Sequence, residues 1–91
     1  MLDKAAESEI QPSVLNTVGY MLFKEGRVDD AIVVFQHNIN AFPEHTDLYD
    51  SLGEAFAVKK DWKRAAECYR LALEGDPSNV NAIEVLRHIE L

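Results

Sequence analysis

The sequence is short of cysteine, of basic residues and of long apolar runs, and each shortage excludes a class of protein. A single cysteine, Cys68, rules out a disulfide within the chain. The chain has nine basic and 16 acidic residues, which gives a net charge of −7. This balance disfavours nucleic acid and anionic membranes as partners, because both attract a cationic surface. No apolar run approaches the roughly 18 residues of a membrane span. Residues 1–10 lack the hydrophobic region of a signal peptide, so the cytoplasm is the default location.

Residues that could carry chemistry do not form a catalytic or metal-binding pattern. His37, His45 and His88 have no second ligand at a metal-binding spacing. Ser51, in "DSLGE", lacks the strand-turn-helix context of a nucleophile elbow. Cys68 lies in an apolar helical pattern, which predicts a small core residue rather than a reactive thiol. We therefore expect no enzyme activity, no metal and no cofactor.

What the chain does contain is a period of 34 residues. Aligning residues 12–45 with residues 46–79 gives only three identities, but the apolar positions match around them. A repeat of this length indicates a stack of small supersecondary units. The matched pairs are Gly19/Gly53, Ala31/Ala65, Phe35/Tyr69, Pro43/Pro77, Leu15/Tyr49, Val18/Leu52, Leu22/Phe56, Val28/Trp62 and Ile39/Leu73.

Each unit is predicted to form two helices. Apolar residues recur at helical spacing in both halves, and no strand-like alternation is seen. Gly26 is placed to end the first helix and Pro43 to end the second. The prediction is an all-α chain of antiparallel helix pairs joined by short turns. Repeat 1 covers 12–45, repeat 2 covers 46–79, a capping helix covers 80–91, and 1–11 form a leader or short helix.

Three positions carry specific expectations. Gly53 lies inside a helix, where glycine costs roughly 1 kcal/mol relative to alanine. We expect another helix to pass close to it, at Ala65 or Tyr69. Asn38 stands one period before Ala72, and a polar side chain at that position should meet a partner or water. Lys60 stands where the first unit has a glycine, which predicts a differently shaped second turn.

These residues resemble the tetratricopeptide repeat (TPR) family over residues 12–91. The resemblance implies a right-handed α-solenoid of two repeats with a C-terminal capping helix. A second, weaker resemblance links "GYMLFKEGRVDDAIVVFQHNINAFPEHTDLYDSLGEAF" to the C-terminal repeat segments of some bacterial serine hydrolases and β-lactamase-like proteins. About two and a half units fall short of the at least three repeats normally needed for stability. We therefore expect this chain to be a domain of a longer bacterial protein.

The resemblance also implies a concave groove lined by the first helix of each unit. Helical spacing puts Asp47, Asp50 and Glu54 in one acidic stripe. The hypothesis is a groove for a basic or amphipathic peptide, with carboxylates facing its cations and aromatic rings stacking on its apolar groups. The alternative is that the carboxylates form a solvated face. The candidate groove residues are Asn16, Tyr20, Phe23, Asp47, Asp50, Glu54, Glu84 and His88.

Some members of the family bind acidic peptide C-termini through a carboxylate clamp. Only Asn16 matches the clamp, and Tyr20, Ser51, Asn81 and Val85 occupy its other positions. The leading prediction is thus a non-catalytic protein-interaction module without that clamp. The other prediction is a structural or regulatory docking domain that self-associates weakly through its terminal helices. Lys59, Lys60, Lys63 and Arg64 crowd one turn, either as a solvated turn or as a contact patch.

Overall fold

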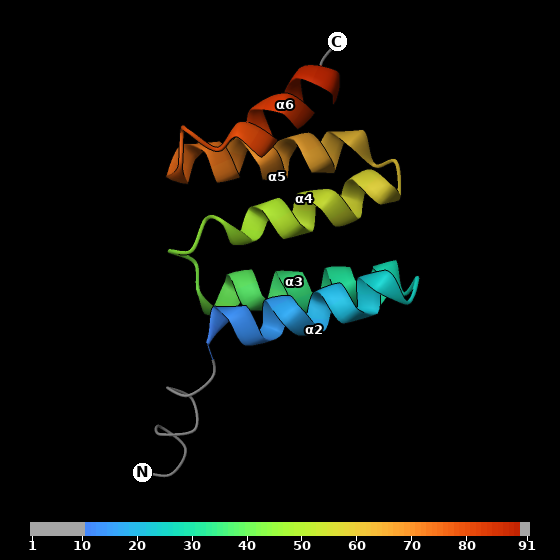
Figure 1. Cartoon of the computed structure of the whole chain (residues 1–91). Helices are drawn as coiled ribbons and strands as arrows, with labels where there is room; N and C mark the ends of the chain where they lie inside the picture. The colour runs from blue at the N-terminus through green and yellow to red at the C-terminus, as the bar shows by residue number, and fades with distance from the viewer. Residues whose placement is uncertain (1–10, 90–91) are drawn as a thin grey trace.

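The computed structural model describes residues 11–89, which form five helices and no strand (Figure 1). The predicted leader, residues 1–11, lies outside the described part except for Gln11. None of the described helices is long and apolar enough to cross a membrane. The helices are α2 (Pro12–Lys24), α3 (Val28–Ala41), α4 (Leu48–Val58), α5 (Trp62–Gly75) and α6 (Val80–Ile89).

The helices stack in chain order as antiparallel pairs. The pair α2–α3 and the pair α4–α5 each form a hairpin, and α4 lies between α3 and α5 (Figure 1). Helix α6 packs on α5. Helix α2 also contacts α4, whereas α4 separates α3 from α5. The first helices of the units therefore lie on the inner side of the stack. We call the surface of α2, α4 and α6 on that side the inner face.

In each hairpin, a glycine on the first helix packs against an aromatic ring on the second helix, as the sequence predicted for Gly53. A Cβ at Gly53 would lie 2.8 Å from Cε2 of Tyr69, and a Cβ at Gly19 would lie 2.3 Å from Cε1 of Phe35. Both rings belong to the core, since Phe35 is 2% exposed and Tyr69 is 3% exposed. Glycine is thus required here for close packing and not for backbone freedom.

The two hairpin turns have the same geometry, so the expectation of a different second turn is wrong. In the first, Gly26 adopts φ 85°, and the N–H groups of Gly26 and Arg27 donate to Phe23 and Leu22. In the second, Lys60 adopts φ 63°. Its N–H and that of Asp61 donate to Ala57 and Phe56. Both are Schellman turns. Lys60 accepts a left-handed conformation because the two helices fix the path of the chain.

The predicted apolar stripes face the core, with two exceptions. Val18 is 40% exposed, although its counterpart Leu52 is only 6% exposed. Leu52 packs in the interior of the stack, whereas α2 is the first helix of the described chain. Trp62 was also predicted to be a core residue but is 49% exposed.

Two buried polar or reactive groups behave as expected. Asn38 is fully buried, and its Nδ2 donates to the carbonyl oxygen of Pro12 at 2.9 Å, which links α3 to the start of α2. Its Oδ1 has no hydrogen-bond partner among the described residues. Cys68 is buried, and desolvation raises the pKa of its thiol to about 11.

Candidate functional site

The inner face is held together by hydrogen bonds between neighbouring first helices. The Tyr20 hydroxyl on α2 donates to Oε1 of Glu54 on α4, at 2.7 Å. The Ser51 hydroxyl on α4 donates to Oδ1 of Asn16 on α2, also at 2.7 Å. The structure therefore brings three predicted groove residues, Asn16, Tyr20 and Glu54, into two hydrogen bonds between α2 and α4. Tyr20 and Glu54, both predicted to contact a ligand, are already hydrogen-bonded to each other.

Tyr20, the donor to Glu54, is half-buried. Its ring meets Phe35 edge-on, with centroids 5.3 Å apart, and lies 6.0 Å from the ring of Phe23. Burial raises the pKa of Tyr20 to about 12, against a smaller lowering by the Ser51 hydroxyl. Tyr20 thus stays a neutral donor to Glu54. Its ring and that of Phe23 already pack against each other, so a ligand would meet the exposed part of this pair.

Asp50 joins α4 to the start of α6. Its Oδ2 accepts from Nδ2 of Asn79 at 2.7 Å, and its Oδ1 accepts from Nδ2 of Asn81 at 3.3 Å. Asn79 in turn caps α6, because its Oδ1 accepts from the N–H of Ala82 at 3.1 Å. Asp50 therefore has a positioning role on the inner face, with both oxygens engaged within the chain.

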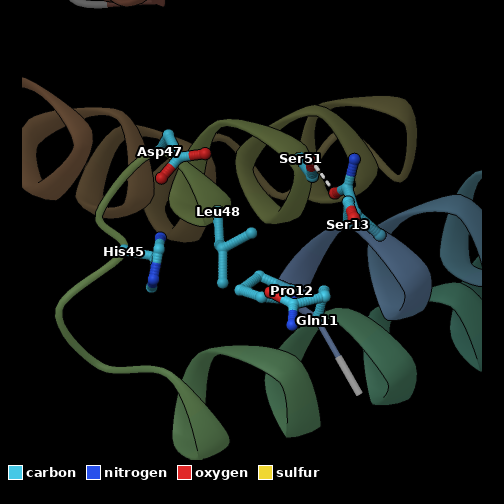
Figure 2. Close-up of a pocket in the computed structure, with 8 residues that line it drawn as sticks. Gln11, Pro12, Ser13, His45, Asp47, Leu48 and Ser51 are labelled. Atoms are coloured by element: carbon cyan, nitrogen blue, oxygen red, sulfur yellow. Dashed lines mark hydrogen bonds between the residues drawn. The ribbon is translucent and has the colours of Figure 1, made fainter. Parts of the chain in front are cut away.

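A polar hollow of about 400 Å³ opens where α2 and α4 begin (Figure 2). Asp47 and Asn16, both predicted groove residues, line it together. Asp47 is the residue before α4 but makes no capping hydrogen bond through its side chain. Its carboxylate therefore accepts no hydrogen bond from the first backbone N–H groups of α4. The other lining residues are Gln11, Pro12, Ser13, His45, Leu48 and Ser51.

The last two predicted residues lie on α6. Glu84 is exposed. His88 lines a second hollow, of about 390 Å³, with Trp62, Val85 and Ile89. We call this the Trp62 hollow. His88 thus lies among apolar residues where α5 begins and α6 ends, apart from the Tyr20–Glu54 hydrogen bond.

Sequence reasoning missed the part played by Ser51, which was considered only as a nucleophile and as a clamp position. The available signal was the repeat itself. Residues one period apart lie on adjacent first helices, and the bonded pairs Tyr20–Glu54 and Asn16–Ser51 are separated by 34 and 35 residues. Among the described residues, no cluster of three His, Cys, Asp or Glu side chains is arranged to hold a metal ion.

Comparison with solved structures identifies the fold. Among 42 matching chains of solved structures is the first TPR of Spaghetti (RPAP3) bound to the HSP90 peptide SRMEEVD. It shares 22% identity with this chain and has a TM-score of 0.50, over 88% of this chain and 90% of that one. This chain has the TPR fold. Its helices α2–α3 and α4–α5 form two helical hairpins, and α6 follows as a single helix. No protein-family model matches the sequence, and neither does any curated protein.

Proposed function

We propose that the chain is a non-catalytic protein-interaction module whose inner face binds a basic or amphipathic peptide segment. The observation that carries the proposal is the polar hollow, which Asp47 lines together with Asn16 and Ser51, and the carboxylate of Asp47 is not used as a helix cap. A cationic side chain of the partner would enter this hollow. The protein's net charge of −7 favours such a partner over long range.

The rest of the inner face supplies a track for the remainder of the segment. Glu54 keeps one carboxylate oxygen beyond the one that accepts from Tyr20. The exposed part of the Tyr20–Phe23 pair supplies apolar area beside it. Because the bonds from Tyr20 and Ser51 hold these side chains in place, binding loses less side-chain entropy than it would on a mobile surface.

The fold neighbour provides support and a contrast. It was solved with the peptide SRMEEVD, so a peptide ligand is compatible with this fold. That peptide carries three acidic side chains. The inner face here presents Asp47, Glu54 and Glu84, which would repel such a ligand. We therefore propose a peptide partner, as in the fold neighbour, but a basic peptide in place of an acidic one.

The test is isothermal titration of the protein with a short Lys/Arg-rich amphipathic peptide. Asp47→Asn and Glu54→Gln should each weaken binding by up to about fivefold, because an exposed ion pair contributes roughly 0.2–1 kcal/mol. Glu67→Gln, on the exposed surface of α5, removes the same charge elsewhere and should leave the affinity unchanged. Equal losses for all three variants would mean that only net charge matters and would contradict a site on the inner face.

A second candidate function is a docking or self-association domain within a larger protein. The observation that favours it is an exposed apolar stripe on α2, formed by Val14, Val18 and Met21, which are 49%, 40% and 59% exposed. Their counterparts on α4 (Leu48, Leu52 and Ala55) are buried in the stack. On α6, the terminal helix expected to self-associate, Val85 and Ile89 are half-buried, and Leu91 lies outside the described residues. Sedimentation at high protein concentration distinguishes this function, which requires species larger than the 10.3 kDa monomer.

A further inference from the structure

The Trp62 hollow lies where repeat 2 packs on α6. The corresponding place, where repeat 1 packs on α4, has no such hollow among the described residues. Trp62, Val85 and Ile89 stand one period after Val28, Ser51 and Ala55. Where repeat 1 packs on α4 these positions are closed, with Ser51 6% exposed and Ala55 fully buried. Where repeat 2 packs on α6 the corresponding residues are larger, and Trp62 is 49% exposed. Helix α6 accordingly diverges from α5 toward its C-terminal end (Figure 1), and the hollow of about 390 Å³ lies in that wedge.

The hollow presents an apolar surface that residues 11–89 leave open. Trp62 is 49% exposed, and the other lining residues are Val85, Ile89 and His88. Val58, four residues before Trp62, is 52% exposed. A half-exposed tryptophan beside a concave apolar surface is typical of binding sites, because tryptophan supplies much contact area at little conformational cost.

Cations surround Trp62 in the sequence, and two of them form no ion pair within the described part of the chain. Lys59 forms an ion pair with Asp29, and Arg64 pairs with Asp61 and lies over the Phe56 ring. Among residues 11–89, no ion pair involves Lys60 or Lys63. The turn that carries Trp62 is therefore basic, on a chain whose net charge is −7.

We propose that the Trp62 hollow is a second docking site, which accepts an apolar side chain of an acidic peptide segment. The apolar side chain enters between Trp62, Val85 and Ile89, and acidic residues on either side of it meet Lys60 and Lys63. The charge at this site is opposite to that of the inner face, so the two surfaces select different partners. The site does not depend on the inner face binding any ligand.

Fluorescence tests the proposal directly, because Trp62 is the only tryptophan in the chain. The probe is a short peptide with a central Phe-Leu pair flanked by Glu and Asp. Titration should shift the tryptophan emission to the blue as the hollow loses water, and added salt should weaken the binding. A matched peptide with Lys in place of each acid should not shift the emission. No shift with the acidic probe, or an equal shift with both peptides, would overturn the proposal.

Variants locate the site. K60Q/K63Q should weaken binding of the acidic probe by roughly fivefold, since two exposed ion pairs are lost. Glu74→Gln, on the exposed surface near the C-terminal end of α5, should leave it unchanged. Trp62→Ala should abolish binding of the acidic probe. Because this variant has no tryptophan, binding is measured by calorimetry, and far-UV circular dichroism checks that the variant is folded. Unchanged binding by the folded Trp62→Ala variant contradicts the proposal. So does a blue shift that arises from protein concentration alone, because a second copy of the chain would then occupy the hollow.

Discussion

Single residues carry two kinds of constraint in this fold, and they must be separated. Gly19 and Gly53 have ordinary helical backbone and are needed because a ring lies where their Cβ would be. Gly26 has space around it but adopts φ 85°, which other residues rarely adopt. Lys60 adopts a similar φ without being glycine. The first pair thus concerns packing and the second pair concerns backbone conformation.

Gly53→Ala tests the packing constraint. Alanine is the better helix former by about 1 kcal/mol, so a purely local effect predicts a gain in stability. We expect a loss of roughly 1–3 kcal/mol instead, because the new methyl group overlaps the buried Tyr69 ring. Gly19→Ala should lose at least as much, since its Cβ would lie nearer to Phe35. Urea unfolding measures both, and a gain in either variant would refute the close-packing explanation.

Lys60→Gly tests the backbone constraint. A left-handed conformation costs a non-glycine residue roughly 1–2 kcal/mol, and glycine loses part of this advantage through its greater freedom when unfolded. We expect a net stabilisation of about 0.5–1 kcal/mol in urea unfolding. Glu67→Gly, in the exposed middle of α5, is the control and should destabilise by a similar amount. Destabilisation by Lys60→Gly would mean that the lysine side chain stabilises the turn.

At the scale of elements, the helices are connected through polar groups as well as through the core. Asn38 fixes α3 to the first residue of α2. Asp50 and the capping residue Asn79 fix α6 to α4. These bonds position the inner face, because they set where each first helix begins relative to its neighbours.

Asn38→Asp should make stability depend on pH. The buried carboxylate would lose the donor to Pro12 and its pKa would be raised by desolvation, so the loss at neutral pH should be roughly 3 kcal/mol or more. Protonation removes the charge, so the loss should shrink as pH falls below the raised pKa and reach its minimum below about 4, the pKa of an unfolded Asp. Asn38→Ala, which introduces no charge, should cost about 1 kcal/mol at every pH.

Urea unfolding of both variants and the parent protein across this pH range checks the prediction. The quantity to compare is the difference in unfolding free energy from the parent at the same pH. A loss for Asn38→Asp that stays constant from neutral to acidic pH would show that the side chain is hydrated and not buried.

The helices and their pairing could be predicted from the period of 34 residues, because each unit buries the same faces. The shape of the second turn could not, since a strain of roughly 1–2 kcal/mol at Lys60 is small beside the packing of two helices. The exposure of Trp62 was missed because it depends on how far α6 diverges from α5. For the inner face, the pattern predicted which residues share a surface but not that Tyr20 and Glu54 are within 2.7 Å of each other.

At the scale of the whole molecule, charge is divided between two surfaces. The inner face of α2, α4 and α6 carries Asp47, Asp50, Glu54 and Glu84, whereas the turn between α4 and α5 is basic. The two surfaces should therefore respond oppositely to probe peptides of opposite charge. Their helices belong to one small stack, so a general change in stability would affect both, but a local charge substitution should affect only one.

Backbone amide chemical shifts, followed during titration with a Lys/Arg-rich amphipathic peptide, test the central claim most directly. The claim is that the inner face is the binding surface for a basic segment. The expected result is a saturable set of shifts in α2 and α4, centred on Asn16, Tyr20, Asp47 and Glu54, with the α4–α5 turn unaffected. Shifts that are absent from α2 and α4, or that cluster around Trp62, would contradict it.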